Sequence, residues 1–316
     1  MTAPPVSRSG PQRLLFMGTP AFAVPSLERI VKAGHVVAAV FTQPDRPKGR
    51  GGTLAMPPVK EAALRLGLPV HQPERVKRPE VVEQIRALKP DAIAVVGYGQ
   101  IIPASILAIP PHGIINLHAS LLPEYRGAAP IQWAIARGET RTGATTMKID
   151  EGLDTGDMLL KWETAIGPEE TAPELSARLA AAGADLLTRT LAELPTIHPE
   201  PQDDAQATYA PILKKEDGKL DWRLSAREIL NRIRGFEPWP GGYGFLRGQR
   251  FQIWRAALGT PRLPPGALRV INRNLYAGCG DGESLELREV QLEGKKRMPA
   301  AVFLNGFILA DSEVLQ

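Results

Sequence analysis

Residues 91–96 read DAIAVV, and residues 97–99 read GYG. A short apolar run that contains β-branched residues and ends at glycine is typical of a buried strand followed by a turn. Strands that are apolar on both faces belong to parallel sheets, which helices cover on each side. This stretch therefore predicts the central strand of an open α/β fold.

Strands and helices alternate on both sides of this central strand. Before it, the pattern predicts strands at 14–17 and 35–42 and helices at 22–32, 58–66 and 79–88. Thr19 and Pro20 are predicted to be the N-cap and the first residue of the first helix. After it, the pattern predicts strands at 113–118, 142–150 and 157–164 and a long amphipathic helix at 172–194. The alternation indicates an open, mostly parallel, Rossmann-like sheet.

A second domain is expected because 316 residues are more than one compact core usually needs. Residues 195–204 read PTIHPEPQDD, and their prolines and charges predict a linker. We therefore expect an N-terminal domain at 1–194, a linker at 195–208 and a C-terminal domain at 209–316. The last domain shows a helix at 225–234 and short strands at 251–256, 267–271, 275–279 and 284–291. Short strands separated by glycine turns suggest a small OB-like β-barrel.

The composition argues against a membrane-spanning protein and against a protein held together by internal disulfides. Hydrophobic residues make up 43% and charged residues 23% of the chain, and no apolar run approaches the roughly 20 residues that cross a bilayer. The single cysteine, Cys279, cannot form an internal disulfide, which fits a reducing compartment. The polar N-terminus resembles no secretory signal, so we expect the protein in the bacterial cytoplasm. We also expect it to be a monomer.

The charge of the chain is uneven along its length. The net charge is +4, but the residues after Asp204 include 17 basic and 12 acidic side chains. A basic excess of this size suits contact with phosphates. Among these basic residues, the candidates for phosphate contacts are Lys214, Lys215, Arg232, Arg234, Arg247, Arg250, Lys295, Lys296 and Arg297. A solvated surface explains such residues almost as well.

Polar residues occupy the end of the predicted strand at 113–118. Asn116 and His118 lie two residues apart, so both side chains face the same side of an extended strand. Ligands of open α/β sheets bind beyond the carboxyl ends of the strands. With Asp154 from the loop after the next strand, these residues supply an oxyanion donor, a proton relay and a carboxylate that orients the histidine. Each taken singly is more often structural: a strand cap, an interior histidine and a turn aspartate.

The surrounding sequence favours the catalytic interpretation. Residues 116–127 read NLHASLLPEYRG and resemble the signature of the folate-dependent formyltransferases, with Asp154 at the spacing of that family. Further segments resemble the members that act on methionyl initiator tRNA: FMGTP at 16–20, TQPDRP at 42–47, GRG at 49–51, GAAPIQW at 127–133 and DTGDM at 154–158. The resemblance extends from about residue 14 into the C-terminal domain and is weakest after residue 261.

The resemblance implies a formyltransferase fold and a specific reaction. The formyl donor would be 10-formyltetrahydrofolate, lined by Ser120, Leu121, Leu122 and Pro123, and the acceptor would be the α-amino group of methionine on initiator tRNA. Asn116 would polarise the formyl carbonyl, and His118 with Asp154 would move the proton of the amine. No metal is required. The domain at 1–194 would be catalytic, and the OB-like domain at 209–316 would bind tRNA.

A basic, glycine-rich loop at 44–56 is the second informative stretch. A flexible solvated connection is the commoner explanation of such a composition. In the tRNA-formylating members a basic loop at this place contacts the acceptor stem, so Arg46, Lys48 and Arg50 are the candidate tRNA contacts. This chain keeps Arg50 but has GGT at 51–53, where some relatives have further lysines.

Three other functions remain open at this point. The signature is shared by formyltransferases that act on amino sugar nucleotides and by formyltetrahydrofolate hydrolases, which work without tRNA. A non-enzymatic alternative is an RNA-binding module with a degenerate enzyme domain, against which the intact Asn116, His118 and Asp154 argue.

Overall fold

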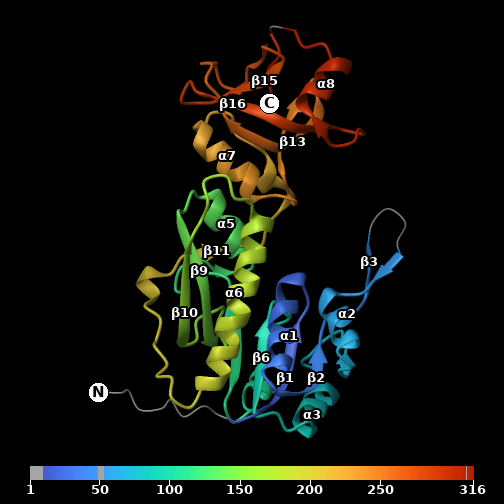
Figure 1. The fold of residues 1–316 in the computed structure, drawn as a ribbon, viewed down its shortest axis with the longest axis vertical. Helices are drawn as coiled ribbons and strands as arrows, with labels where there is room; N and C mark the ends of the chain where they lie inside the picture. The colour runs from blue at the N-terminus through green and yellow to red at the C-terminus, as the bar shows by residue number, and fades with distance from the viewer. Residues whose placement is uncertain (1–9, 49–52, 311) are drawn as a thin grey trace. The chain divides into compact units, whose positions relative to one another are not determined.

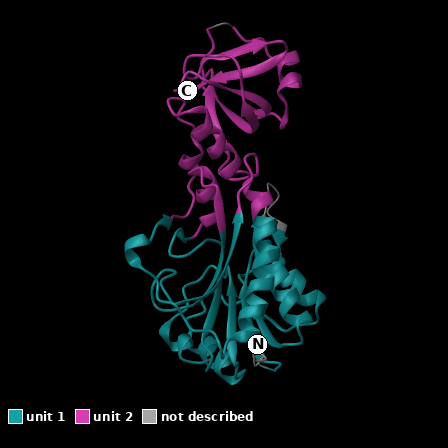
Figure 2. Cartoon of the chain, turned by 60° about the vertical axis from the view of Figure 1, so that its left-hand side comes forward, with its two compact units in different colours: residues 1–127, 143–164, 176–209 teal, residues 128–142, 165–175, 210–316 magenta. Residues whose placement is uncertain are grey.

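The computed structural model describes residues 10–48, 53–310 and 312–316. The chain forms two compact units (Figure 2). The first consists of Met1–Gly127, Gly143–Thr164 and Ser176–Tyr209, and the second of Ala128–Thr142, Ala165–Leu175 and Ala210–Gln316. Each unit is therefore built from segments that are separate in the sequence.

The first unit is organised around a seven-stranded sheet with the order β10-β9-β7-β6-β1-β2-β5 (Figure 1). The strands are β1 (Arg13–Gly18), β2 (Val36–Phe41), β5 (Val70–His71), β6 (Ala92–Val96), β7 (Ile114–His118), β9 (Arg141–Lys148) and β10 (Met158–Ala165). Pairing is parallel from β5 through β2, β1 and β6 to β7, while β9 runs antiparallel to β7. The predicted open, mostly parallel α/β sheet is confirmed, with β6 in its middle.

Helices cover both faces of the sheet. They are η1 (Ala21–Ala23), α1 (Val24–Lys32), α2 (Pro58–Arg65), α3 (Pro79–Ala87), α4 (Ala104–Leu107) and α6 (Ala172–Glu193). Leu14 and Phe16 of β1 pack in the core with α1, α2 and α6, while Leu15 and Met17 pack with α3 and α4. This alternation gives two apolar layers. None of the helices within the described residues is long and apolar enough to cross a membrane.

Helix α6 packs very closely on β7, the strand that carries Asn116 and His118. A Cβ built on Gly183 would lie 2.8 Å from the Leu117 side chain of β7. Glycine weakens a helix interior, so its presence here is explained by the close approach that it permits. Leu117 thereby fills the α6 face of β7, and its neighbours Asn116 and His118 point to the opposite face.

The predicted N-cap at Thr19 is wrong. Pro20 is the residue that precedes η1, and no side chain caps that helix. The Thr19 hydroxyl instead donates a hydrogen bond to the carbonyl of Tyr98, at 2.9 Å. A tertiary contact between the ends of β1 and β6 has replaced the local cap.

The second unit contains an antiparallel β domain. Its strands are β12 (Gly242–Leu246), β13 (Gln249–Leu258), β14 (Leu268–Ile271), β15 (Asn274–Gly278), β16 (Ser284–Leu292) and β17 (Met298–Pro299). The main path is β12-β13-β16-β15-β14, and β17 pairs with β16. The unit also holds α5 (Pro130–Ala136), α7 (Ala226–Gly235) and α8 (Ala300–Gly306). A capping box between Ser225 and Glu228 begins α7.

The C-terminal residues close this sheet. Phe245 of β12 exchanges two backbone hydrogen bonds with Gln316, at 2.8 and 3.0 Å. Leu268 of β14 donates to the Glu313 carbonyl at 2.9 Å. The last residues of the chain therefore join the two edge strands, which gives the β domain the barrel character that its short strands predicted.

Cys279 lies inside the β domain and is expected to be inert in the folded protein. Its side chain is fully buried, and burial raises the pKa of the thiol to about 12. The reactive thiolate is therefore scarce at neutral pH. We predict no labelling by a thiol-reactive disulfide in native buffer and stoichiometric labelling after denaturation. Prompt labelling of the native protein would contradict the burial.

Candidate active site

Strand β7 places Asn116 and His118 at the carboxyl end of the parallel part of the sheet. Asn116 pairs with Val95 of β6 on one side and with Met147 of β9 on the other. Its side chain is half-buried and has no hydrogen-bond partner within the described residues. An amide that is fixed by its strand but unpaired is able to donate to a ligand oxygen.

His118 is buried, and one partner fixes its tautomer. Its Nε2 lies 2.9 Å from the Tyr125 carbonyl oxygen. Because a carbonyl only accepts, Nε2 is the donor in this contact. Nδ1 faces Oδ2 of Asp154 at 3.6 Å, which is longer than a direct hydrogen bond. Nδ1 is therefore the ring nitrogen placed to exchange a proton, and the Tyr125 carbonyl sets the tautomer of the ring.

Asp154 is held in an unusual backbone conformation. Its φ is 53°, in the left-handed region that costs a non-glycine residue free energy. Its Oδ2 accepts a hydrogen bond from the Gly127 amide at 2.9 Å, and its side chain is 17% exposed. Asp154 is thus more accessible than His118, whose side chain is 7% exposed. The pair combines an enclosed imidazole with a carboxylate that is partly exposed.

The loop that carries Asp154 is organised by its own side chains. Asp150 accepts hydrogen bonds from the Gly152 amide at 3.0 Å and from the Thr155 hydroxyl at 2.8 Å. A Cβ on Gly156 would lie 2.0 Å from the Lys148 carbonyl, so only glycine fits there. Glycine at position 156 is therefore required by the close approach of the Lys148 carbonyl, and not only by the flexibility of the turn.

The four residues at 120–123 differ in orientation. The side chains of Ser120 and Leu122 are each 1% exposed, whereas Leu121 and Pro123 are partly exposed. Thr145 supports the segment, since its hydroxyl donates to the Ser120 carbonyl at 2.7 Å and accepts from the Leu122 amide at 3.2 Å. Leu121 and Pro123 are the side chains of this segment that remain available to a ligand.

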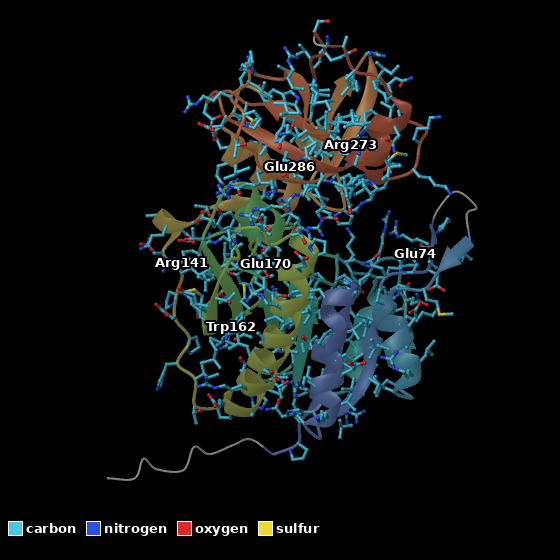
Figure 3. The ribbon with its side chains drawn as sticks, turned by 45° about the horizontal axis from the view of Figure 1, so that its top comes forward. Glu74, Arg141, Trp162, Glu170, Arg273 and Glu286 are labelled. Atoms are coloured by element: carbon cyan, nitrogen blue, oxygen red, sulfur yellow. The ribbon has the colours of Figure 1, made fainter. Side chains whose placement is uncertain are left out.

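Leu121 also depends on the sheet beneath it. A Cβ on Gly143 of β9 would lie 2.5 Å from the Leu121 side chain and 2.0 Å from the carbonyl of Trp162 on β10, which Figure 3 labels. Glycine at 143 therefore allows both strand pairing and the packing of Leu121.

The predicted basic loop contains a hairpin. Strands β3 (Arg46–Lys48) and β4 (Thr53–Ala55) pair antiparallel, with Arg46 opposite Ala55 and Lys48 opposite Thr53. The Arg46 side chain is exposed, and Arg50 lies outside the described residues. The hairpin begins beside helix α2 (Figure 1).

Asp45 fixes the base of this hairpin. Its carboxylate binds Lys60 Nζ at 2.6 Å and the Gln72 amide at 2.7 Å. These two hydrogen bonds lower the pKa of Asp45, with that from Lys60 the larger cause. The first acidic residue of the loop is therefore occupied within the protein and does not neutralise Arg46.

Residues 200–208 support the site through hydrogen bonds that the sequence does not predict. Gln202 Nε2 donates to the carbonyls of Asp154 and Gly156, at 2.8 and 2.7 Å. Its Oε1 accepts from Arg126 Nε at 3.0 Å. Thr208 accepts from the Tyr125 amide at 2.8 Å. The predicted linker at 195–208 thus makes specific hydrogen bonds to the site, and its sequence has no periodic pattern that predicts them.

One of the candidate C-terminal cations is internal. Arg234 is 7% exposed, and its Nη1 donates to the carbonyls of Gly167 and Glu170 at 3.1 and 2.8 Å. Its Nε donates to Asn231 Oδ1 at 3.0 Å. Burial lowers the pKa of Arg234. This guanidinium therefore organises the protein and is not available to a phosphate.

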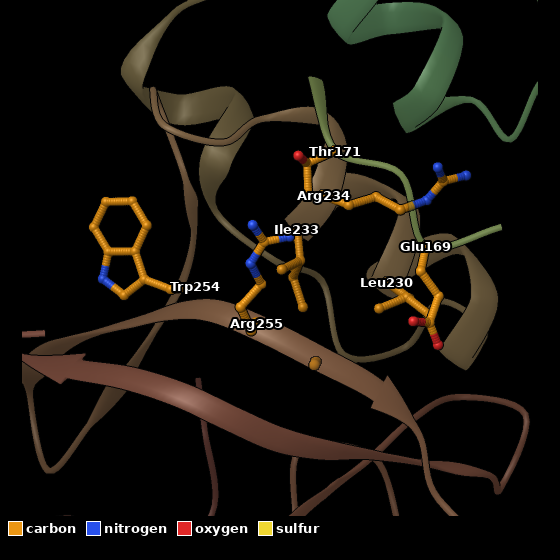
Figure 4. Close-up of a pocket in the computed structure, with 8 residues that line it drawn as sticks. Glu169, Thr171, Leu230, Ile233, Arg234, Trp254 and Arg255 are labelled. Atoms are coloured by element: carbon orange, nitrogen blue, oxygen red, sulfur yellow. The ribbon is translucent and has the colours of Figure 1, made fainter. Parts of the chain in front are cut away.

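A small cavity of the second unit adjoins Arg234 (Figure 4). Its lining includes Trp254, Arg255 and Glu169, and it has room for about one water molecule. A cavity of this size excludes a cofactor. Among the described residues, no group of three or more His, Cys, Asp or Glu side chains is arranged to hold a metal ion.

Comparison with known families defines the class of protein. Residues 12–191 match the formyl transferase model, and residues 212–308 match the model of the formyl transferase C-terminal domain. These matches cover most of the chain and agree with the α/β sheet and the site at the end of β7. The fold and the site define a formyl-transferring enzyme.

Sequence identity to individual relatives identifies the group of formyl transferases to which the chain belongs. The chain is 60% identical to a methionyl-tRNA formyltransferase of Solibacter usitatus, over 96% of this chain and 98% of the relative. It is also 60% identical to one of Koribacter versatilis, over 93% of this chain and 95% of the relative. The chain belongs to the methionyl-tRNA formyltransferase family.

Solved structures share the fold at lower identity. An N-formyltransferase of Helicobacter canadensis, solved with folinic acid and dTDP-3-aminofucose, aligns with a TM-score of 0.64 at 19% identity, over 87% of this chain and 98% of that one. The sugar 3N-formyl transferase WlaRD aligns with a TM-score of 0.66 at 18% identity, over 91% of this chain and 100% of that one. These similarities support the architecture of the chain.

Proposed function

We propose that this enzyme transfers the formyl group of 10-formyltetrahydrofolate to the α-amino group of methionine on initiator tRNA. The observation that supports this most is the combination of Asn116, His118 and Asp154 at one end of the sheet in a chain 60% identical to methionyl-tRNA formyltransferases. The product, N-formylmethionyl-tRNA, serves the start of translation.

Direct attack by the amine explains why no serine or cysteine nucleophile is needed. The amine nitrogen bonds to the formyl carbon, and negative charge develops on the formyl oxygen, where the Asn116 amide donates a hydrogen bond. The amine loses a proton to the His118 and Asp154 pair. The bond between the formyl carbon and N10 then breaks, and N10 keeps the electron pair and takes up that proton. Tetrahydrofolate and the formylated aminoacyl-tRNA leave.

The donor would lie against the segment at 120–123. Leu121 and Pro123 supply partly exposed apolar side chains, whereas the side chains of Ser120 and Leu122 are buried. We assign residues 1–194 to catalysis and residues 209–316 to tRNA binding, with 195–208 connecting them. We also propose that the enzyme acts as a monomer in the bacterial cytoplasm.

The acceptor is tested by comparing substrates. Purified protein is incubated with 10-formyltetrahydrofolate and, in parallel, methionyl initiator tRNA, methionyl elongator tRNA, an amino sugar nucleotide or water alone. Formylated product and released tetrahydrofolate are both measured. We expect initiator tRNA to be the preferred acceptor. Turnover in water or on the sugar nucleotide without turnover on initiator tRNA would refute the proposal.

The basic hairpin is expected to contribute to tRNA binding. Arg50→Ala should raise the KM for initiator tRNA. It should also reduce the slope of log kcat/KM against log salt concentration by about one, because each neutralised phosphate releases counterions. The KM for the formyl donor should stay unchanged. Lys32→Ala is the matched control, since Lys32 ends α1 at the amino edge of the sheet. Equal salt slopes for wild type and Arg50→Ala would remove the hairpin from the tRNA site.

A further inference from the structure

The two contacts that orient the catalytic pair both depend on unusual backbone. Tyr125, whose carbonyl binds His118, has a φ of 60°, and Asp154 has a φ of 53°. Both values lie in the left-handed region, which non-glycine residues adopt only when the surrounding structure holds them. The protein must therefore hold two distant residues, 125 and 154, in unfavourable conformations at once.

Residues 200–208, here called the brace, contact both of these positions. Gln202 Nε2 binds the carbonyl of Asp154 itself at 2.8 Å. Thr208 Oγ1 accepts from the Tyr125 amide at 2.8 Å, and the Thr208 carbonyl accepts from the Arg126 amide at 2.8 Å. Two backbone hydrogen bonds between Glu200 and Met158, at 2.8 and 2.9 Å, secure the start of the brace.

The chemistry of this contact requires a carboxamide at position 202. Arg126 is 2% exposed and only donates, so it needs an acceptor, while the carbonyls of Asp154 and Gly156 only accept and need donors. Gln202 satisfies all three, with Oε1 toward Arg126 and both amide hydrogens toward the carbonyls. Glutamate has no donor at neutral pH, and lysine has no acceptor.

The orientation of Gln202 is fixed in turn. Arg126 Nη2 binds Asp204 Oδ1 at 2.8 Å, so the guanidinium contacts two residues of the brace. A buried guanidinium with both contacts made has little freedom to turn, and it presents Nε to Gln202. The chain of contacts runs from Asp204 through Arg126 and Gln202 to the backbone of Asp154.

We propose that Gln202 is a positioning residue that sets the geometry of Asp154 against His118. This inference rests on the proposed function for the role of Asp154. Gln202 touches no reacting atom and acts through the Asp154 backbone. Loss of its two donated hydrogen bonds is expected to release Asp154 from its left-handed conformation and move the carboxylate away from Nδ1 of His118.

The test compares Gln202→Ala and Gln202→Glu in the full chain. Both should lower kcat by up to about 100-fold, the scale of a displacement of about 1 Å, while the KM values for donor and acceptor stay close to wild type. Gln202→Glu keeps an acceptor for Arg126 but sets a negative charge against two carbonyls, so it should be at least as slow as Gln202→Ala. The control is Gln206→Ala, an exposed glutamine of the same segment whose amide binds Asp203 at 2.9 Å. It should retain wild-type kcat.

A double-mutant cycle separates positioning from general stability. In an Asp154→Ala background, Gln202→Ala should cause no further loss of kcat, because the residue through which it acts is gone. Multiplicative losses in the two variants would overturn the proposal, as would wild-type kcat in Gln202→Ala. Thermal melting of each variant identifies any loss of kcat that is caused by unfolding of the protein.

The failure of this proposal differs from that of the proposed function. A wild-type chain that does not formylate initiator tRNA refutes the function, and the same cycle is then run on release of tetrahydrofolate in water. A crystal structure of Gln202→Glu provides a readout independent of activity. Displacement of the Asp154 carboxylate from the Gly127 amide supports the proposal, and an unchanged loop overturns it.

Discussion

Replacement of His118 by alanine is expected to lower kcat for formyl transfer by about 10²- to 10⁴-fold, the usual contribution of a general acid–base residue. The reason is geometric. His118 directs Nδ1 toward Asp154 because the Tyr125 carbonyl holds Nε2, so its removal takes away the group that accepts the proton of the amine. Initial rates at saturating donor and tRNA provide the measurement.

A matched variant distinguishes proton transfer from structural support. In His118→Gln the side-chain amide is able to donate to the Tyr125 carbonyl, but it cannot accept and return a proton near neutral pH. The proton-relay role predicts that His118→Gln is as slow as His118→Ala. Recovery of activity in the glutamine variant would show that His118 serves only to hold Tyr125.

Replacement of Asn116 by alanine is expected to lower kcat by about 10²- to 10³-fold, as loss of one oxyanion donor does in other enzymes. Asn116 is fixed between β6 and β9, and its amide is unpaired within the part of the chain that the structure describes. The hydrogen bond to the developing oxyanion is made in the transition state, so the loss should fall on kcat more than on KM.

Asn116→Asp tests the sign of the charge at this position. The aspartate has nearly the same shape but sets a carboxylate against the oxygen that becomes negative. It should be slower than Asn116→Ala, because repulsion is added to the loss of the donor. An aspartate variant faster than the alanine variant would contradict the oxyanion role.

The architecture of the first unit was predictable because its apolar runs are short, regular and bounded by turns. The strand at 91–96 and the pair Asn116 and His118 follow from alternation alone, since β7 continues the pleat through both residues. The family resemblance then supplied the chemistry. Each of these inferences depends on residues that are close in sequence.

Contacts between distant residues were not predictable in this way. Gln202 lies 48 positions from Asp154, in a segment whose prolines and charges give no periodic signal. Thr19 has the composition of a helix cap, but its hydroxyl binds Tyr98. Closure of the β domain depends on residues such as Gln316 that pair with strands far earlier in the chain. Tertiary hydrogen bonds override local preference at all three places.

The orientation of the segment at 120–123 is a further example. Sequence patterning treats Ser120 and Leu122 like their neighbours, yet both side chains are buried. The buried Thr145 hydroxyl on β9 supports the backbone on both sides of Leu121. The identity of the supporting residue depends on strand order, which the sequence pattern alone does not define.

The central claim is that the formyl group passes directly from the folate to the methionine amine of initiator tRNA. Its most direct test is a single-turnover reaction with enzyme in excess over methionyl initiator tRNA and a donor that carries an isotopically labelled formyl carbon. The label should appear on the methionine nitrogen in step with the release of one equivalent of tetrahydrofolate, and His118→Ala should slow both signals together. Label that remains on the protein, or tetrahydrofolate released without formylated methionine, would contradict the account.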